Sequence, residues 1–370
     1  PSVSLSFSKK RRLLKKPIIN LSILHPYIRG RLTQINNGTY PKQHYWATDA
    51  LLDATDIEAC FVKHHTFKIP KLITKIINRK ILQGRSDFRN EIDAWSAAKS
   101  SDLMYSVCGP LSFSRFYKKC QLISWVFQPP VVNYKSPLHP YNESNLRNHA
   151  GFLCLTPTAE KFFSQFAPAK FVPWCVDTDL FDGKPAVNKP ENAFFLASGK
   201  TGRDYMTLVK SAESVRAEVR IIGPKEQKPL SIPENLTWID TSSDPPDQAI
   251  DYPTLREWYA QCIGVCIPLS GDANDTCGYT NMLEAMAMGK PVLMTKSGSL
   301  HIDPKTSEFG KLIEPQDSSG WAKSMNELFD DQTLAQRLGE NGRRLAKKDF
   351  SIHRFNSEVL SFIRGLDKKV

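Results

Sequence analysis

The chain has 370 residues, more than one ordinary hydrophobic core holds, so two domains are expected. Hydrophobic residues make up 41% and charged residues 24%, as in globular proteins, and no apolar run reaches the roughly 18 residues of a membrane-spanning helix. The apolar run after the basic start "KKRRLLKK" is too short for a signal peptide. We therefore expect a cytoplasmic protein, with peripheral attachment to the inner face of the membrane left open.

The net charge of +11 is unevenly distributed along the chain. Residues 1–177 contain 25 basic and 11 acidic side chains, a net +14, whereas residues 178–370 contain 24 and 27, a net −3. A basic half predicts an anionic partner, which can be a nucleic acid, an acidic membrane surface or an anionic substrate.

The cysteines show no spacing typical of a metal site or a disulfide framework. None belongs to a C-x-x-C pair, and most lie within apolar stretches. We expect reduced, mostly buried thiols and no bound metal. The eight are Cys60, Cys108, Cys120, Cys154, Cys175, Cys262, Cys266 and Cys277.

The N-terminal half contains five short apolar runs that predict strands, separated by helical patterns. They are "IINLSIL" (18–24), "DIEACFV" (56–62), "LMYSVCG" (103–109), "LISWVF" (122–127) and "GFLCLT" (151–156). The segment "DTDLFDGKPAVNKPEN" (177–192) is polar and contains proline, as expected of a linker between domains.

Residues 68–85, "KIPKLITKIINRKILQGR", predict a basic amphipathic helix. Such a helix can lie on an anionic membrane surface, together with the basic residues 9–16, or it can pack on the sheet with a solvated basic face. The pattern leaves both alternatives open. The apolar side comprises Leu72, Ile73, Ile76 and Ile77, and the other sides carry Lys71, Lys75, Arg79 and Lys80.

From residue 193 the chain alternates between strand and helix patterns, and a helical tail follows at 321–366. This alternation predicts parallel strands with right-handed crossovers, in which ligands bind at the carboxyl ends of the strands. Two Rossmann-like halves are the simplest interpretation of the whole chain. The strands expected here are "AFFLASG" (193–199), "AEVRIIG" (217–223), "IGVCIPLS" (263–270) and "PVLMTKSG" (291–298).

The stretch "GYTNMLEAMAMGKPV" (278–292) places one glutamate in an otherwise apolar helix. Asn281 followed by Glu284 is a capping-box pattern, which predicts a helix beginning near Thr280 or Asn281. A helix start preceded by Gly278 also suits an anion. From this stretch alone, Glu284 either caps its own helix or holds a ligand.

The same stretch resembles the C-terminal domain of GT-B glycosyltransferases, and most closely their retaining family four. The resemblance covers residues 170–370 well and is faint over the N-terminal half. It rests on "IPLSGDANDTCGYTNMLEAMAMGKPVLMTKSGS" (267–299) and on three further segments in register: "FVPWCVDTDLF" (171–181), "FLASGKTGRDYMTLVKSA" (195–212) and "LREWYAQCIGVCIPLS" (255–270).

The resemblance implies an α/β fold of the GT-B type, with two Rossmann-like domains facing a cleft. It implies acceptor binding in residues 1–180 and nucleotide-sugar binding in residues 181–351. The closing helix, at about 352–370, is then expected to cross back onto the N-terminal domain.

The resemblance also implies roles for individual residues. Glu284 takes the place of the glutamate that binds the ribose, and the helix start faces the diphosphate. Lys200 and Arg203 match the basic pair at the leaving diphosphate, where fixed cations lower the barrier without a metal, although a solvated basic loop is the alternative. The catalytic residues expected are Lys200, Arg203 and Glu284, and the donor-binding residues are Gly38, Gly199, Lys200, Arg203, Gly278, Tyr279, Thr280, Asn281 and Glu284.

One position departs from the family pattern. Thr276 stands where many members carry a second glutamate near the transferred sugar. Either Asp275, with Asp272 nearby, takes over this contact, or backbone N–H groups and Thr280 do. In the N-terminal half, Gly38 lies in the expected glycine-containing loop. His25, His44 and His149 are candidates near the acceptor, although a lone histidine is more often structural.

These features predict a glycosyltransferase that uses a UDP- or GDP-sugar as co-substrate, with retention of configuration and with no metal or other cofactor. The acceptor is expected to be a saccharide, a lipid or lipid-linked saccharide, or a small molecule. A GT-B enzyme of another class, such as a sugar-nucleotide epimerase, is the alternative. A non-enzymatic nucleic-acid binder is disfavoured because no such module is recognisable, so no nucleic-acid partner is expected.

Overall fold

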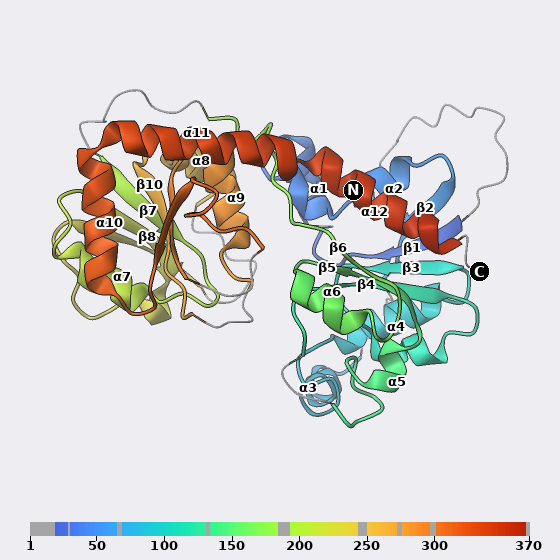
Figure 1. Ribbon diagram of the computed structural model, residues 1–370. Coiled ribbons are helices and arrows are strands. Elements are labelled where there is room, and N and C mark those ends of the chain that lie inside the picture. The colour runs from blue at the N-terminus through green and yellow to red at the C-terminus, as the bar shows by residue number, and fades with distance from the viewer. Residues whose placement is uncertain are drawn as a thin grey trace.

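The computed structural model describes residues 19–28, 30–64, 69–130, 134–183, 193–242, 250–271, 276–296 and 301–367. Within these residues the chain forms two six-stranded sheets, and Figure 1 shows them in separate halves of the molecule. Every strand pair in both sheets is parallel. The predicted α/β class with two Rossmann-like halves is confirmed.

The first sheet has the strand order β2-β1-β3-β4-β5-β6, so the order reverses between β1 and β3. Its central strands are buried because helices cover both faces, which explains their continuous apolar runs. Its strands are β1 (Ile19–Leu24), β2 (Ile57–Phe61), β3 (Leu103–Ser106), β4 (Gln121–Val126), β5 (His149–Cys154) and β6 (Ala169–Phe171).

The second sheet has the order β12-β11-β10-β7-β8-β9, which is the strand order of dinucleotide-binding Rossmann folds. The order reverses between β7 and β10. Its strands are β7 (Phe194–Ser198), β8 (Glu218–Pro224), β9 (Leu236–Thr241), β10 (Gly264–Ile267), β11 (Val292–Thr295) and β12 (Gly310–Ile313).

Helices connect the strands in both halves. In the first half they are α1 (Leu32–Asn36), the 3-10 turn η1 (Lys42–Tyr45), α2 (Thr48–Asp53), α3 (Lys71–Lys80), α4 (Phe88–Ala97), η2 (Ser112–Phe116), α5 (Glu143–Leu146) and α6 (Pro157–Phe163). In the second half they are α7 (Tyr205–Ala212), η3 (Lys225–Gln227), α8 (Tyr252–Gln261), α9 (Tyr279–Ala287), α10 (Ser318–Asp330) and α11 (Gln332–Asp349).

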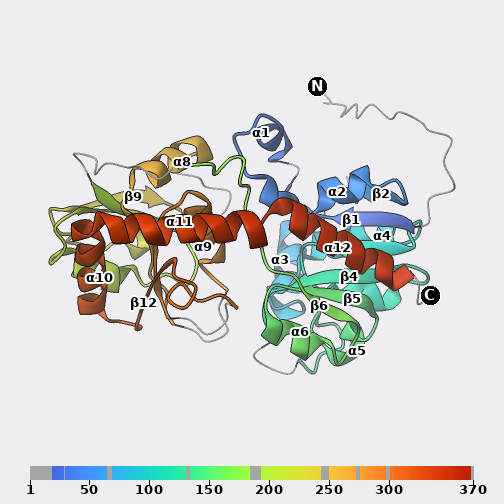
Figure 2. The same cartoon turned by 45° about the horizontal axis from the view of Figure 1, so that its top comes forward.

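The last helix, α12 (Ile352–Asp367), lies on the first half of the molecule, as Figures 1 and 2 show. The Phe355 ring stacks on Trp125 of β4 at 5.3 Å between centroids, and Arg364 donates two hydrogen bonds to the Asp56 carboxylate. The prediction that the closing helix crosses back is therefore confirmed.

The chain passes between the two halves twice, at neighbouring positions. Val176, after β6, forms a parallel bridge with Ser351, and its N–H donates to the carbonyl of Phe350 at 2.9 Å. Two adjacent crossings leave few covalent constraints between the halves, a geometry suited to hinge motion. The boundary expected at residues 180 and 181 stays a prediction.

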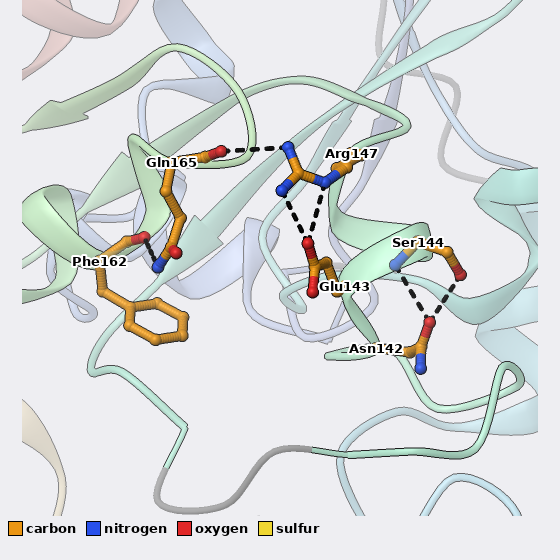
Figure 3. A network of polar contacts seen from close by, with 6 residues as sticks. All are labelled: Asn142, Glu143, Ser144, Arg147, Phe162 and Gln165. Carbon is orange, nitrogen blue, oxygen red and sulfur yellow. Dashed lines mark hydrogen bonds and ion pairs between the residues drawn. The ribbon is translucent and has the colours of Figure 1, made fainter.

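A surface network of polar contacts joins α5 to the segment after α6 (Figure 3). Asn142 accepts hydrogen bonds from the backbone N–H and the hydroxyl of Ser144 at the start of α5. Arg147 pairs with Glu143 and donates to the carbonyl of Gln165 after α6. Because these side chains are exposed, we expect the ion pair to add little stability.

All eight cysteines are unpaired, and five of them are buried. Of the described helices, none combines the length and the apolar character needed to cross a bilayer. The basic residues 9–16 lie outside the described residues.

Candidate active site

The predicted donor residues gather where the strand order of the second sheet reverses. The loop after β7 contains Gly199, Lys200 and Arg203, and Arg203 forms an antiparallel bridge with Leu269 just after β10. Ligands of open α/β sheets bind at the carboxyl ends of the strands at such a reversal. The loop also faces the start of α9, because a side-chain hydrogen bond joins Arg203 to Asn281.

The Arg203 guanidinium joins three segments. Its Nε donates to the carbonyl of Ser198 at 3.2 Å, its Nη1 to the carbonyl of Thr201 at 2.8 Å, and its Nη2 to Asn281 Oδ1 at 2.7 Å. A guanidinium has five N–H donors, more than these three bonds use. The side chain lies across Gly199, where φ is +134° and a Cβ would collide with the guanidinium.

The helix begins within one residue of the predicted start near Thr280, but its cap differs from the prediction. Helix α9 begins at Tyr279, and its N-cap residue is Gly278, at φ +84° and with no side-chain cap. A Cβ at Gly278 would lie 2.5 Å from Ile267 Cγ2, so the turn has room only for glycine. The predicted Asn281–Glu284 capping box is therefore wrong.

The first turn of α9 keeps the properties of an anion site, since the N–H groups that begin a helix have no partner within it. Asn281 is fixed in this turn, because its Nδ2 donates to Ser198 Oγ at 3.0 Å. Thr280 is half-buried. The Tyr279 side chain instead belongs to the core, where its hydroxyl lies 3.3 Å from His301 Nδ1.

Glu284 lies in the second turn of α9 and is 1% exposed. Its Oε1 accepts a hydrogen bond from Gln43 Nε2 at 3.2 Å, and its Oε2 accepts one from the Tyr259 hydroxyl at 3.1 Å. Burial raises the pKa of this carboxyl to about 8. Asn281 Nδ2 lies 3.4 Å from the same Tyr259 hydroxyl, so a chain of hydrogen bonds connects Glu284 to Arg203.

Glu284 is also held from the other half of the molecule, by a residue that the sequence does not predict. Gln43, in the 3-10 turn η1, is also 1% exposed, and its Oε1 accepts a hydrogen bond from the Asp177 N–H at 2.6 Å. Asp177 Oδ2 in turn accepts from the Lys42 N–H at 2.9 Å. Asp177 lies in the segment 171–181 that resembles the family, but no local pattern predicts its contact with Gln43 or the contact of Gln43 with Glu284, because both join segments far apart in the chain.

An aromatic contact also joins the loop after β1 to α8. The Tyr40 ring meets the Tyr252 ring edge-on at 4.9 Å, and the Tyr252 hydroxyl lies 3.4 Å from His44 Nε2. His25 Nε2 donates to the carbonyl of His44 at 2.8 Å. Burial lowers the pKa of His25 and of His44 to about 4, so both are neutral at pH 7.

The other residues predicted from the sequence either take no part in this contact or lie outside the residues that the structure describes. Gly38, at φ +69°, ends α1, and its N–H donates to the carbonyl of Ile35. His149 stacks on Phe152 within the first sheet. Asp272 and Asp275 lie outside the described residues, so the contact that replaces the missing carboxylate stays a prediction.

Among the described residues, no three His, Cys, Asp or Glu side chains are grouped so as to hold a metal ion. The structure thus brings together Gly199, Lys200, Arg203, Gly278, Asn281 and Glu284, while the ligand each would bind stays a prediction.

Comparison with known proteins agrees with this arrangement. Residues 203–331 match the family model described as glycosyl transferases group 1. No curated protein sequence matches the chain.

Three solved structures share the fold across nearly the whole chain. Sucrose-phosphate synthase from Thermosynechococcus elongatus has a TM-score of 0.62 at 14% identity, and the alignment covers 95% of this chain and 100% of that one. HepE from Anabaena, solved with UDP and glucose, has a TM-score of 0.59 at 13% identity, with 94% and 100% covered. WaaG, a glycosyltransferase involved in lipopolysaccharide biosynthesis, has a TM-score of 0.59 at 12% identity, also with 94% and 100% covered.

The strand orders, the returning C-terminal helix and these neighbours confirm the GT-B fold. Nearly the whole chain therefore shares the GT-B fold, and its residues 203–331 match the glycosyl transferases group 1 family.

Proposed function

We propose that this glycosyltransferase transfers a sugar from a UDP- or GDP-sugar to an acceptor bound mainly by the N-terminal half. The observation that carries the proposal is the Arg203 contact, which fixes the basic loop after β7 against the first turn of α9. Cations and helix N–H groups then converge at the reversal point of a Rossmann sheet, where a diphosphate fits. HepE, solved with UDP and glucose on the same fold, supports this donor class.

In this proposal the chain acts mainly on the leaving group. Breaking the bond between the sugar and the β-phosphate places negative charge on the departing diphosphate. Arg203 and the start of α9 stabilise that charge because they are held in position before the reaction begins, and Lys200 adds a second cation on the same loop. Glu284 binds the ribose, and no metal is required. The resemblance to the retaining family supports retention of the anomeric configuration.

The test is a thermal-shift screen with UDP- and GDP-sugars, followed by an assay of nucleoside diphosphate release. Binding of one donor raises the melting temperature, because a ligand that binds only the folded state stabilises it. Release of the nucleoside diphosphate is expected only when an acceptor is present. Release without transfer to any acceptor would favour an epimerase-like enzyme, and no thermal shift with any nucleotide sugar would contradict the proposal.

We further propose that the acceptor is a lipid or lipid-linked saccharide and that α3 docks on an anionic membrane. None of the residues of α3 is buried, and its apolar side chains Leu72, Ile73 and Ile76 are 69%, 47% and 51% exposed. This exposure disfavours an ordinary helix packed on the sheet. In Figure 1, α3 lies at the edge of the first half, below the strands.

A groove of about 690 Å³ beside α3 supports the same proposal. Its lining includes Lys71, Lys75, Arg79 and Arg89, and none of its lining residues is acidic. Phosphate headgroups fit such a surface, while the exposed apolar side chains enter the boundary between headgroups and acyl chains.

Sedimentation with phosphatidylglycerol vesicles tests the docking face. Replacing Lys75 and Arg79 by glutamine is expected to weaken binding roughly 30-fold, since each cation near an anionic surface contributes about 1 kcal/mol. The matched control is Lys323→Gln with Lys348→Gln, two exposed lysines on α10 and α11. Docking through α3 would be contradicted if both double variants bound phosphatidylglycerol vesicles equally well. It would also be contradicted if the wild-type protein bound phosphatidylcholine vesicles as well as phosphatidylglycerol vesicles.

A further inference from the structure

The burial of Glu284 conflicts with direct access for a ribose. Both of its oxygens accept hydrogen bonds, and the residue is 1% exposed. A ribose hydroxyl needs an open path to one of these oxygens. The Tyr259 bond comes from the same half of the molecule, whereas the Gln43 bond comes from the other half, so a relative movement of the halves breaks only the second one.

The orientation of the Gln43 amide follows from its partners. The Asp177 backbone N–H can only donate, so the oxygen that it contacts at 2.6 Å is Oε1 and the nitrogen Nε2 faces Glu284. The amide therefore donates an N–H to the carboxyl group. A ribose hydroxyl would donate an O–H to the same atom, which makes the two contacts chemically alike and mutually exclusive.

A separation of the halves at Gln43 requires the neighbouring contacts to break. The loop after β1 meets α8 through the Tyr40 and Tyr252 rings and through the long contact between His44 and Tyr252. The covalent crossings at Val176 and Ser351 lie side by side. Hinge motion around ligands commonly turns on a few such residues, so we infer that the segment around Gln43 and α8 part while both sheets keep their structure.

We propose that Gln43 covers the Glu284 carboxyl in the ligand-free protein and withdraws when the ribose of the donor binds. This inference rests on the proposed donor role of Glu284. The Gln43 amide satisfies a buried oxygen that would otherwise have no donor from that side, and the nucleotide replaces the amide by a hydroxyl. Binding of the donor is thereby coupled to the position of the N-terminal half.

The proposal predicts that removing Gln43 strengthens nucleotide binding. Gln43→Ala is expected to lower the dissociation constant of UDP roughly 2- to 12-fold, which corresponds to a hydrogen bond that no longer competes. Titration calorimetry with UDP, and with GDP in parallel, measures the change. Inorganic pyrophosphate lacks a ribose, so its affinity is expected to stay unchanged.

Tyr259→Phe is the matched control, because it removes the other donor to Glu284 while leaving the contact between the halves intact. It is expected to give no tightening. If Gln43→Ala weakens UDP binding, Gln43 positions Glu284 and does not cover it, and the proposal fails. Equal tightening in both variants, or tightening for pyrophosphate, also contradicts it.

A second variant covers the case in which Gln43→Ala does not fold. Gln43→Met keeps the length of the side chain but has no N–H, so we expect UDP to bind more tightly than to wild type, by a smaller factor than in Gln43→Ala. Unchanged UDP binding in Gln43→Met would contradict the proposal. The outcome for Glu284→Gln separates the two levels of inference. If that variant binds UDP normally, the donor role of Glu284 fails; if it binds weakly while the Gln43 variants show no gain, only the cover fails.

Discussion

Replacing Arg203 by alanine is expected to lower kcat/KM by about 10²- to 10³-fold, the usual cost of removing one preorganised donor to developing negative charge. The variant also loses the three bonds that join the loop after β7, its strand end and Asn281 of α9. Arg203→Lys is expected to recover little activity, since one ammonium group cannot span these three acceptors in the geometry of a guanidinium.

Steady-state kinetics with the donor found in the screen measure this effect. Arg216→Ala is the matched control, because Arg216 lies in the same half and pairs with Asp330 at the surface. We expect that control to keep wild-type kcat/KM. Near-normal activity of Arg203→Ala would remove the diphosphate role from this side chain and return the loop to the solvated alternative.

Glu284→Gln is expected to weaken nucleotide binding roughly 10- to 150-fold, because hydrogen bonds to a charged group contribute about 1.5 to 3 kcal/mol. The loss is expected in the dissociation constant of UDP or GDP measured by calorimetry at pH 8.5, where the wild-type carboxyl is largely ionised. Glu314→Gln, which breaks an exposed pair with Lys296, is the matched control. Equal affinities for the two variants would contradict ribose binding by Glu284.

Glu284→Gln is also expected to change how the stability of the folded protein depends on pH. Burial raises the pKa of Glu284 to about 8 in the folded protein, from the 4.5 usual for a glutamate in water. Between these values the folded state keeps a proton that the unfolded state has lost, so the stabilisation present below pH 4.5 disappears as the pH rises through 8. Melting curves should therefore show wild type losing stability relative to Glu284→Gln between about pH 5 and 9. A constant difference across this range would contradict the raised pKa.

The strands that the sequence analysis missed are β6, β9 and β12. Each lies at the edge of a sheet, where one side of the strand has no neighbour within the sheet. Strand β9 alternates between buried and exposed residues, and β6 and β12 have only three and four residues. Their apolar signal is weak because little of each strand is covered, unlike the continuous runs of the central strands.

The candidate site likewise has parts that are local in the sequence and contacts that join distant segments. The loop after β7 and the stretch around α9 are predictable, because glycine, basic residues and an apolar helix follow each other within short segments. The capping box was wrong for a physical reason. Gly278 enters the helix with a positive φ, so α9 starts before Asn281 and Glu284 turns towards Tyr259.

The α/β class, the two Rossmann-like halves, the excess of positive charge in residues 1–177 and the segments of the candidate donor site were predictable from the sequence. Hydrophobic periodicity, the positions of glycines and the distribution of charge are properties of short segments, so they can be recognised without knowledge of the fold. The contact between Gln43 and Glu284, 241 residues apart in the sequence, and the exposure of the apolar side of α3 became visible only in the folded chain. Both features depend on how helices and strands pack against one another. Such packing involves segments that are distant in the sequence, so no single segment predicts it.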